Sequence, residues 1–124
     1  MKMNSISGIT CLVKDVPTTA AFYDALGFRI GKQADDRLTC YVNWFWVEFI
    51  GQASDPIHQQ EAQLPNRGAG QFLHIKVENA DAFYEGVLAK GLTPDGAPQG
   101  KPTTGRSFVL RDPDGYKLVF FEKK

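Results

Sequence analysis

The stretch NWFWVEFIG, residues 43 to 51, places the carboxylate of Glu48 among two tryptophans and two phenylalanines. A carboxylate in this setting can act as a metal ligand, as an acid or base, or as a countercharge for a flat ligand that stacks on the indoles. Equally, the aromatic residues can simply fill a core. His74 is the other side chain suited to such chemistry, because His58 lies in a polar segment. Glu48 and His74 are therefore the candidate catalytic residues.

Alternation along residues 45 to 50 predicts which side chains accompany Glu48. Successive side chains of a strand point to opposite faces, so Trp46 shares the face of Glu48 while Phe49 points toward a helix layer. Trp44 has the same parity as Trp46, although it lies close to the predicted turn. The strand therefore predicts an indole-lined surface with one acid in it.

The elements that hold this strand follow one order in the first half of the chain. Residues 6 to 14 alternate as a strand, Asp15 and Pro17 are suited to begin a helix, and Gly27 is suited to end it. Three strands are then predicted over residues 29 to 34, 38 to 43 and 45 to 50.

The same order recurs in the second half. A strand over residues 71 to 79 leads to a helix capped by Asn79 or Asp81 and ended by Gly91. Residues 92 to 105 are rich in proline and glycine and can hold only a short irregular strand. DPDG, residues 112 to 115, predicts a hairpin between the last two strands. The chain is therefore expected to be one domain with modules at 1–51 and 71–124 and a linker at 52–70.

Size, charge and cysteine usage exclude several classes of protein. The chain has 124 residues, with 14 basic and 14 acidic residues and no basic cluster, so no nucleic-acid partner is expected. It also has no apolar run of the ~18 residues that a membrane span needs and no signal peptide, so we expect a cytoplasmic protein without a membrane partner. Cys11 and Cys40 lie in predicted strands and are interpreted as buried free thiols.

Three segments carry a family resemblance: LVKDVPTTAAFYDALGF (12 to 28), VENADAFYEGVLAKGL (77 to 92) and GRSFVLRDPDGYKLVFFE (105 to 122). At these spacings the chain resembles the vicinal oxygen chelate superfamily, which includes glyoxalase, extradiol dioxygenases, fosfomycin resistance proteins and bleomycin resistance proteins. The resemblance implies an α+β fold in which two βαβββ modules form a curled mixed sheet around a cavity. It also implies a homodimer.

Metal-using members of this superfamily carry ligands at four strand positions. The corresponding positions of this chain are occupied by Gly8, Glu48, Phe72 and Val119. Of these four residues, only Glu48 has a side chain that can coordinate a metal. His74 lies two residues beyond Phe72, a displacement of roughly 6.6 Å along a strand. No cofactor is therefore expected, and a divalent metal (Zn, Ni, Fe or Mn) is the alternative.

A buried carboxylate needs a partner, and His74 is the expected partner of Glu48, with a cavity water as the alternative. Arg37, Lys101 and Arg106 are interpreted as surface or rim charges without a chemical role. The loop from Thr93 to Gly105 either closes over a ligand or is only a long connection.

These features predict a small-molecule-binding protein that sequesters a planar aromatic or cationic compound, as the bleomycin resistance proteins do in antibiotic resistance. The predicted ligand contacts lie on the interior faces of several strands: Trp44, Trp46, Glu48, Phe72, His74, Val119 and Phe121. One alternative is an enzyme of this superfamily, a lyase, isomerase or dioxygenase that uses a metal or uses His74 and Glu48 as acid and base. A sensing or interaction module without chemistry is another.

Overall fold

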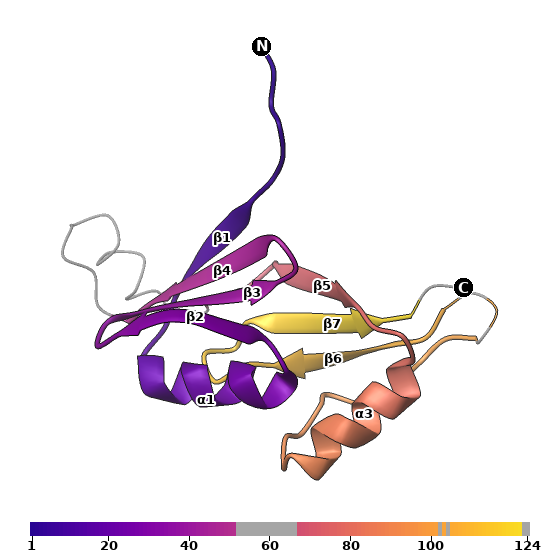
Figure 1. Ribbon diagram of the computed structural model, residues 1–124. Coiled ribbons are helices and arrows are strands. Elements are labelled where there is room, and N and C mark those ends of the chain that lie inside the picture. Colours follow the sequence, from indigo (N-terminus) through magenta and orange to yellow (C-terminus); the bar gives the residue numbers. More distant parts are fainter. Residues whose placement is uncertain (52–66, 102, 104, 123–124) are drawn as a thin grey trace. The chain divides into compact units, whose positions relative to one another are not determined.

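The computed structural model describes residues 1–51, 67–101, 103 and 105–122 (Figure 1). The chain divides into two compact units, Met1–Arg67 and Gly68–Lys124. Most of the predicted linker, including His58, lies outside the described residues.

The first unit contains one mixed four-stranded sheet, called sheet A, and one helix. Its elements are β1 (Gly8–Leu12), α1 (Val16–Leu26), β2 (Arg29–Ala34), β3 (Arg37–Val42) and β4 (Phe45–Ile50). The strands lie in the order β1-β4-β3-β2, with β1 parallel to β4 and the other neighbours antiparallel. The predicted βαβββ order of this half is confirmed.

Local hydrogen bonds explain where α1 begins and ends. The Asp15 carboxylate accepts a hydrogen bond from the backbone N–H of Thr18 at 3.0 Å and another from its hydroxyl. At the other end Gly27 adopts a left-handed conformation with φ 97°, which a residue without Cβ adopts at little cost. Both predicted ends of this helix are confirmed.

One face of sheet A packs against α1 and forms the core of this unit. Phe49 is fully buried, and its ring centroid lies 4.6 Å from that of Tyr23 in α1. Leu38, Cys40 and Val47 are buried as well. The predicted alternation of β4 is confirmed, because Phe49 points to the helix. The face of each sheet that points away from the helix of its own unit is called the distal face below.

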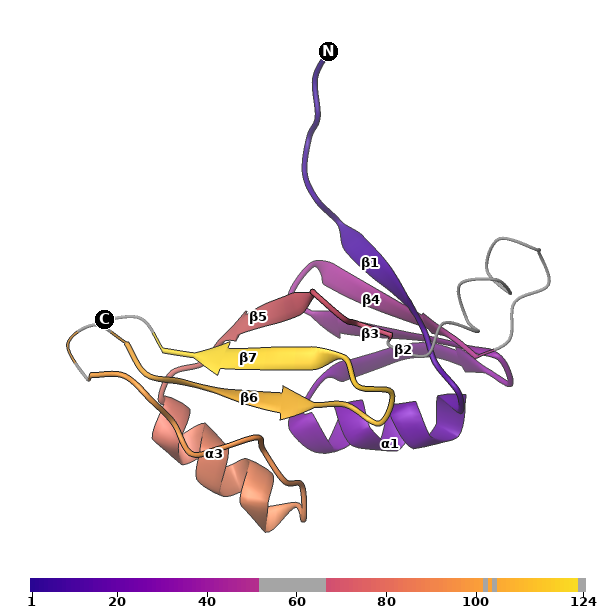
Figure 2. The ribbon, with the colours of Figure 1, turned by 180° about the vertical axis from the view of Figure 1, so that it is seen from behind.

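The second unit contains a three-stranded sheet, called sheet B (Figure 2). Its elements are β5 (Phe72–Lys76), α3 (Ala80–Ala89), β6 (Ser107–Arg111) and β7 (Lys117–Phe121). The strand order is β5-β7-β6, with β5 parallel to β7 and β6 antiparallel to it. The predicted short irregular strand consists of a single bridge between Gln99 and Ser107. Nearby Pro98 has no N–H to donate, and Gly100 has φ 103°, so a regular ladder cannot continue there.

Aromatic side chains fill the space between α3 and sheet B. The ring of Phe83 in α3 stacks on Phe120 with centroids 4.6 Å apart, and Phe108 lies 5.3 Å from Phe120. Asn79 caps the helix by accepting a hydrogen bond from the N–H of Ala82 at 2.8 Å. The core of this unit therefore forms on the helix side of the sheet, as in the first unit.

The predicted hairpin between β6 and β7 is confirmed. The Asp112 carboxylate accepts hydrogen bonds from the N–H groups of Asp114 and Tyr116, both at 2.9 Å. Gly115 has φ 93°, which suits glycine in a tight turn. Neither α1 nor α3 could span a bilayer, since the described part of the chain contains no helix of sufficient length and apolarity.

Candidate ligand-binding faces of the two sheets

Glu48 lies on the distal face of sheet A, where two neighbouring strands supply its partners. Its carboxylate accepts a hydrogen bond from the Thr10 hydroxyl at 3.3 Å and one from Nη1 of Arg37 at 3.3 Å. The Glu48 side chain is 24% exposed. These partners belong to the same unit, whereas His74, the partner expected from the sequence, belongs to the other unit.

Arg37 was not predicted as a site residue, although the hairpin register contains the signal for it. In the antiparallel pair of β3 and β4, Thr39 faces Glu48 and Arg37 faces Ile50. Arg37 is therefore the diagonal neighbour of Glu48, within reach of a long side chain. Centring the predicted hairpin on residues 43 and 44 would have placed the two charges together.

Trp46 lies against the backbone of β1 at Gly8. The two residues are partners in the parallel register of β1 and β4. A Cβ atom added to Gly8 would lie 2.1 Å from Cδ2 of Trp46 and 2.4 Å from both Cε2 and Cε3. Only glycine therefore leaves room for the indole in this position.

Tyr41 is the partner of Trp46 across β3 and β4, so the two aromatic side chains are neighbours on the distal face. A Cβ atom added to Gly31 in β2 would lie 2.7 Å from Cε2 of Tyr41, so this ring also occupies space that a glycine leaves open. The guanidinium carbon of Arg29 lies 4.4 Å from the centroid of the Tyr41 ring. Sequence reasoning did not include Tyr41 or Arg29 among the site residues.

Trp44 lies outside the strand that carries Trp46. It is in the turn between β3 and β4, next to Asn43 with φ 53°, and it is 73% exposed. Trp46 is therefore the tryptophan that the structure places on the strand beside Glu48.

The predicted residues of the second unit share the distal face of sheet B. His74 pairs with Val119 in the register of β5 and β7, and its ring centroid lies 6.2 Å from that of Phe121. Phe72 is 53% exposed, and Nζ of Lys117 lies 4.8 Å from the centroid of its ring. Lys117 was missed from the sequence, although it is the direct register partner of Phe72.

The metal positions implied by the family resemblance do not fit a metal ion. Gly8, Phe72 and Val119 have no side-chain donor atom, and the indole of Trp46 lies against Gly8. The carboxylate of Glu48 is already bonded to Thr10 and Arg37. Among the residues that the structure describes, no group of three or more His, Cys, Asp or Glu side chains could hold a metal ion.

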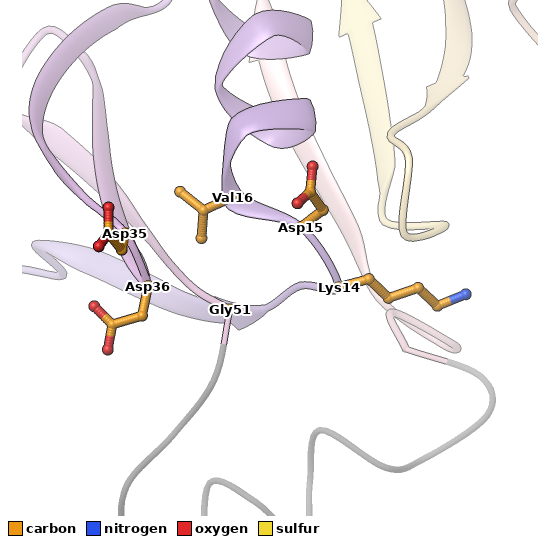
Figure 3. Close-up of a pocket in the computed structure, with 6 residues that line it drawn as sticks. All are labelled: Lys14, Asp15, Val16, Asp35, Asp36 and Gly51. Atoms are coloured by element: carbon orange, nitrogen blue, oxygen red, sulfur yellow. The ribbon is translucent and has the colours of Figure 1, made fainter.

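A hollow of about 450 Å³ lies at another place in the first unit, beyond the last residue of β4 (Figure 3). It is lined by residues before α1, at the start of α1, between β2 and β3, and after β4: Lys14, Asp15, Val16, Asp35, Asp36 and Gly51. Asp15 is engaged as the helix cap. None of the predicted ligand contacts lines this hollow.

Cys11 and Cys40 are buried thiols in sheet A that form no disulfide, as predicted. Burial raises the pKa of the Cys40 thiol to about 12, and the nearby Asp24 carboxylate contributes to the increase. The Cys40 thiol therefore stays protonated near neutral pH and is not an activated nucleophile.

Comparison with known proteins gives a family and a fold. The family described as "Glyoxalase/Bleomycin resistance protein/Dioxygenase superfamily" matches residues 5–120. No curated protein matches the chain.

Several solved structures share the fold at low sequence identity. One is a glyoxalase/bleomycin resistance protein/dioxygenase from Nocardioides, with 16% identity, a TM-score of 0.75, and coverage of 99% of this chain and 85% of that one. A virulence protein from Salmonella typhimurium has 20% identity, a TM-score of 0.73 and full coverage of both chains. An integron cassette protein from V. cholerae has 21% identity, a TM-score of 0.74, and coverage of 100% and 98%.

Proposed function

Because this chain belongs to the glyoxalase/bleomycin resistance protein/dioxygenase superfamily, we propose that it binds and sequesters a planar aromatic small molecule without a metal. The observation that carries the proposal is the pair of neighbouring aromatic side chains, Trp46 and Tyr41, on the distal face of sheet A. An exposed aromatic ring face offers stacking area to any flat π-system.

The two glycines give this aromatic surface its shape. Trp46 occupies the space above Gly8, and Tyr41 occupies space beside Gly31, so each ring is supported by a neighbouring strand. Rings that are already held in place lose little conformational freedom when a ligand binds, and such preorganisation favours affinity. Thr10, Arg37 and Glu48 supply polar groups beside the rings, and a mainly apolar surface with a few polar groups is typical of small-molecule sites.

The predicted contacts of the second unit are proposed as a further set of ligand contacts. Phe72, His74, Val119 and Phe121 share one face of sheet B. This face also combines aromatic area with a few polar groups, so it has the same binding chemistry as the face of sheet A.

The alternative function, an enzyme with His74 and Glu48 as acid and base, has less support. A catalytic acid and base must both reach the reacting atoms, so Glu48 and His74 would have to act at one place. In this structure the two carboxylate oxygens of Glu48 each accept a hydrogen bond, one from Thr10 and one from Arg37.

Titration with planar aromatic compounds tests the proposal. In a Trp44→Phe variant, Trp46 is the only tryptophan of the chain, so quenching of its fluorescence reports ligands on this face. We expect quenching by compounds such as 2-naphthamide, with saturation. By calorimetry, Trp46→Ala should weaken binding by about 1 to 3 kcal/mol.

A substitution at Gly8 tests whether ligand affinity depends on the position of the Trp46 indole and not only on its presence. Gly8→Ala keeps the tryptophan but forces the indole to move, because the new Cβ would overlap it. It should therefore weaken binding as well. Gly86→Ala is the matched control, since an added Cβ meets nothing within 4 Å there. Unchanged affinity in both Trp46→Ala and Gly8→Ala would exclude this face as the binding site.

A further inference from the structure

We infer that the ligand of the distal faces is a planar aromatic anion, with a carboxylate or phosphate group attached to the ring system. The inference rests on the proposed function and names the chemical class of its ligand. Four observations on the charged side chains of the strands carry it.

Glu48 offers a cationic ligand only a partly neutralised charge, because it is paired with Arg37. Its two oxygens accept hydrogen bonds from Arg37 and Thr10, and the guanidinium of Arg37 already balances its charge. A ligand ammonium group beside Glu48 would also lie close to Arg37, and like charges repel each other. The arrangement therefore disfavours the cationic ligand that the sequence alone allowed.

One arginine of sheet A lies over an aromatic ring of the distal face, and another lies beside Glu48 on the same face. Arg29 stacks against the ring of Tyr41 at 4.4 Å, and Arg37 is 55% exposed beside Glu48. With two arginines and one carboxylate, the charged strand residues assigned to this distal face carry a net charge of +1. A guanidinium binds a carboxylate or phosphate through a planar fork of N–H groups.

Sheet B shows the same combination independently. Its strands carry Lys76, Arg111 and Lys117 on the distal face and, within their described bounds, no acidic residue. Nζ of Lys117 lies over the ring of Phe72, as Arg29 lies over Tyr41 in sheet A. Arg111 is paired with Asp95, which lies outside the strands.

In both units, basic residues are concentrated in the strands and acidic residues in the helices. The seven described strands contain six basic residues, whereas Glu48 is their single acidic one. The helices α1 and α3 contain three acidic residues and no basic one. Because the whole chain has a net charge of zero, this is a separation of charge and not an excess. An excess of positive charge on the strands raises the local concentration of anionic ligands.

Four naphthalene probes of similar shape test the inference by calorimetry: 2-naphthoate, 2-naphthyl phosphate, neutral 2-naphthamide and 2-naphthylmethylammonium. We expect at least one anion to bind about tenfold more tightly than the amide, and the ammonium compound to bind most weakly. The two anions distinguish a carboxylate ligand from a phosphate ligand. Amide or ammonium binding as tight as that of both anions would overturn the inference but leave the proposed function standing.

Substitution of Arg37 tests whether the preference for an anionic probe arises on the distal face of sheet A. In Arg37→Gln the advantage of the anion over the amide, taken as the ratio of the two affinities, should fall to about threefold or less. Lys90→Gln is the matched control, because it removes the same charge at the end of α3, outside the strands, and should preserve the preference. If both variants lost the same share of the anion's advantage over the amide, the preference would be a general effect of net charge. That result would overturn its assignment to this face. Failure of every probe to bind would instead contradict the proposed function, and the inference with it.

Discussion

The two units use the same helix-on-sheet packing but place their arginine–carboxylate pairs differently. In the first unit Arg37 and Glu48 meet at a single distance of 3.3 Å on the distal face of sheet A. In the second unit Arg106 binds both carboxylate oxygens of Asp81, at 2.7 and 2.8 Å, and also donates to the carbonyl oxygens of Gly100 and Pro98.

This difference separates a structural ion pair from one that is accessible to a ligand. The Arg106 guanidinium joins the start of α3 to the loop before β6, so its N–H groups are occupied by the fold. Arg37 makes one weaker contact and remains more exposed. Pairs of the same residue types therefore differ in how far the fold occupies their N–H groups, and the hydrogen bonds show this difference.

The largest expected effects compare the two cores. Phe49 and Phe120 are both buried, and each has its ring centroid 4.6 Å from a helix ring, Tyr23 or Phe83. Replacing either phenylalanine with alanine should lower the free energy of unfolding by about 3 to 5 kcal/mol, measured by denaturant titration.

Thiol labelling shows whether the units open separately. Both cysteines of the chain, Cys11 and Cys40, lie in the first unit. Phe49→Ala should therefore accelerate their labelling in native buffer more than Phe120→Ala does, because local opening exposes only nearby groups. Equal acceleration would show that the two units unfold together and would remove this part of the comparison.

A smaller effect compares two carboxylates, Glu122 just after β7 of sheet B and Glu48 within β4 of sheet A. Glu122 is buried after β7 and accepts a hydrogen bond from the N–H of Ala80 at 3.0 Å, at the start of α3. Glu122→Ala should cost about 1 to 3 kcal/mol of stability, because that buried N–H loses an acceptor. Glu48→Ala should cost less than about 1 kcal/mol, since its pair with Arg37 is partly exposed.

Glu122→Gln is the control for this comparison. The amide oxygen can still accept the hydrogen bond from Ala80, so this variant should lose less stability than Glu122→Ala. Thermal or denaturant unfolding measures all three variants. A larger loss in Glu48→Ala than in Glu122→Ala would reverse the roles assigned to the two carboxylates.

The smallest expected effect is a pH dependence in the second unit. Hydrogen bonds from Arg106 lower the pKa of Asp81 below its ordinary value of 3.8. The folded state then binds a proton less readily than the unfolded state, so this stabilisation is present above about pH 4 and is lost as the pH falls through the lowered pKa. Asp81→Asn should therefore flatten the dependence of Tm on pH below about pH 4.

Combining Asp81→Asn with Arg106→Gln tests whether the ion pair between these two residues causes the pH dependence. If the ion pair is responsible, the double variant should show no flatter profile than Asp81→Asn alone. Asp15 supplies a reference in the first unit, because hydrogen bonds from the Thr18 hydroxyl and N–H lower the pKa of its carboxyl group. Its contribution should persist in Asp81→Asn, and a completely flat profile in that variant would contradict the assignment.

The sequence by itself determined the elements and the faces of the strands. The cap at Asp15, the glycine after α1 and the turn at DPDG depend on residues a few positions apart, so each is visible in a short stretch of sequence. The alternation that buries Phe49 and leaves Glu48 on the other face is also a local property of a strand. For this reason the fold class and most element bounds were predicted correctly, and only the strand expected near residue 99 was reduced to a bridge.

Only the tertiary structure decided which side chains meet. The partners of Glu48 are 38 and 11 residues away along the chain, and the support of Trp46 by Gly8 depends on the parallel register of two strands that are distant in sequence. A shift of that register by one residue would turn the paired side chains to opposite faces. The register also aligned Tyr41 with Trp46 and collected the basic side chains on the distal faces, because pairing between strands is a long-range property of the folded chain.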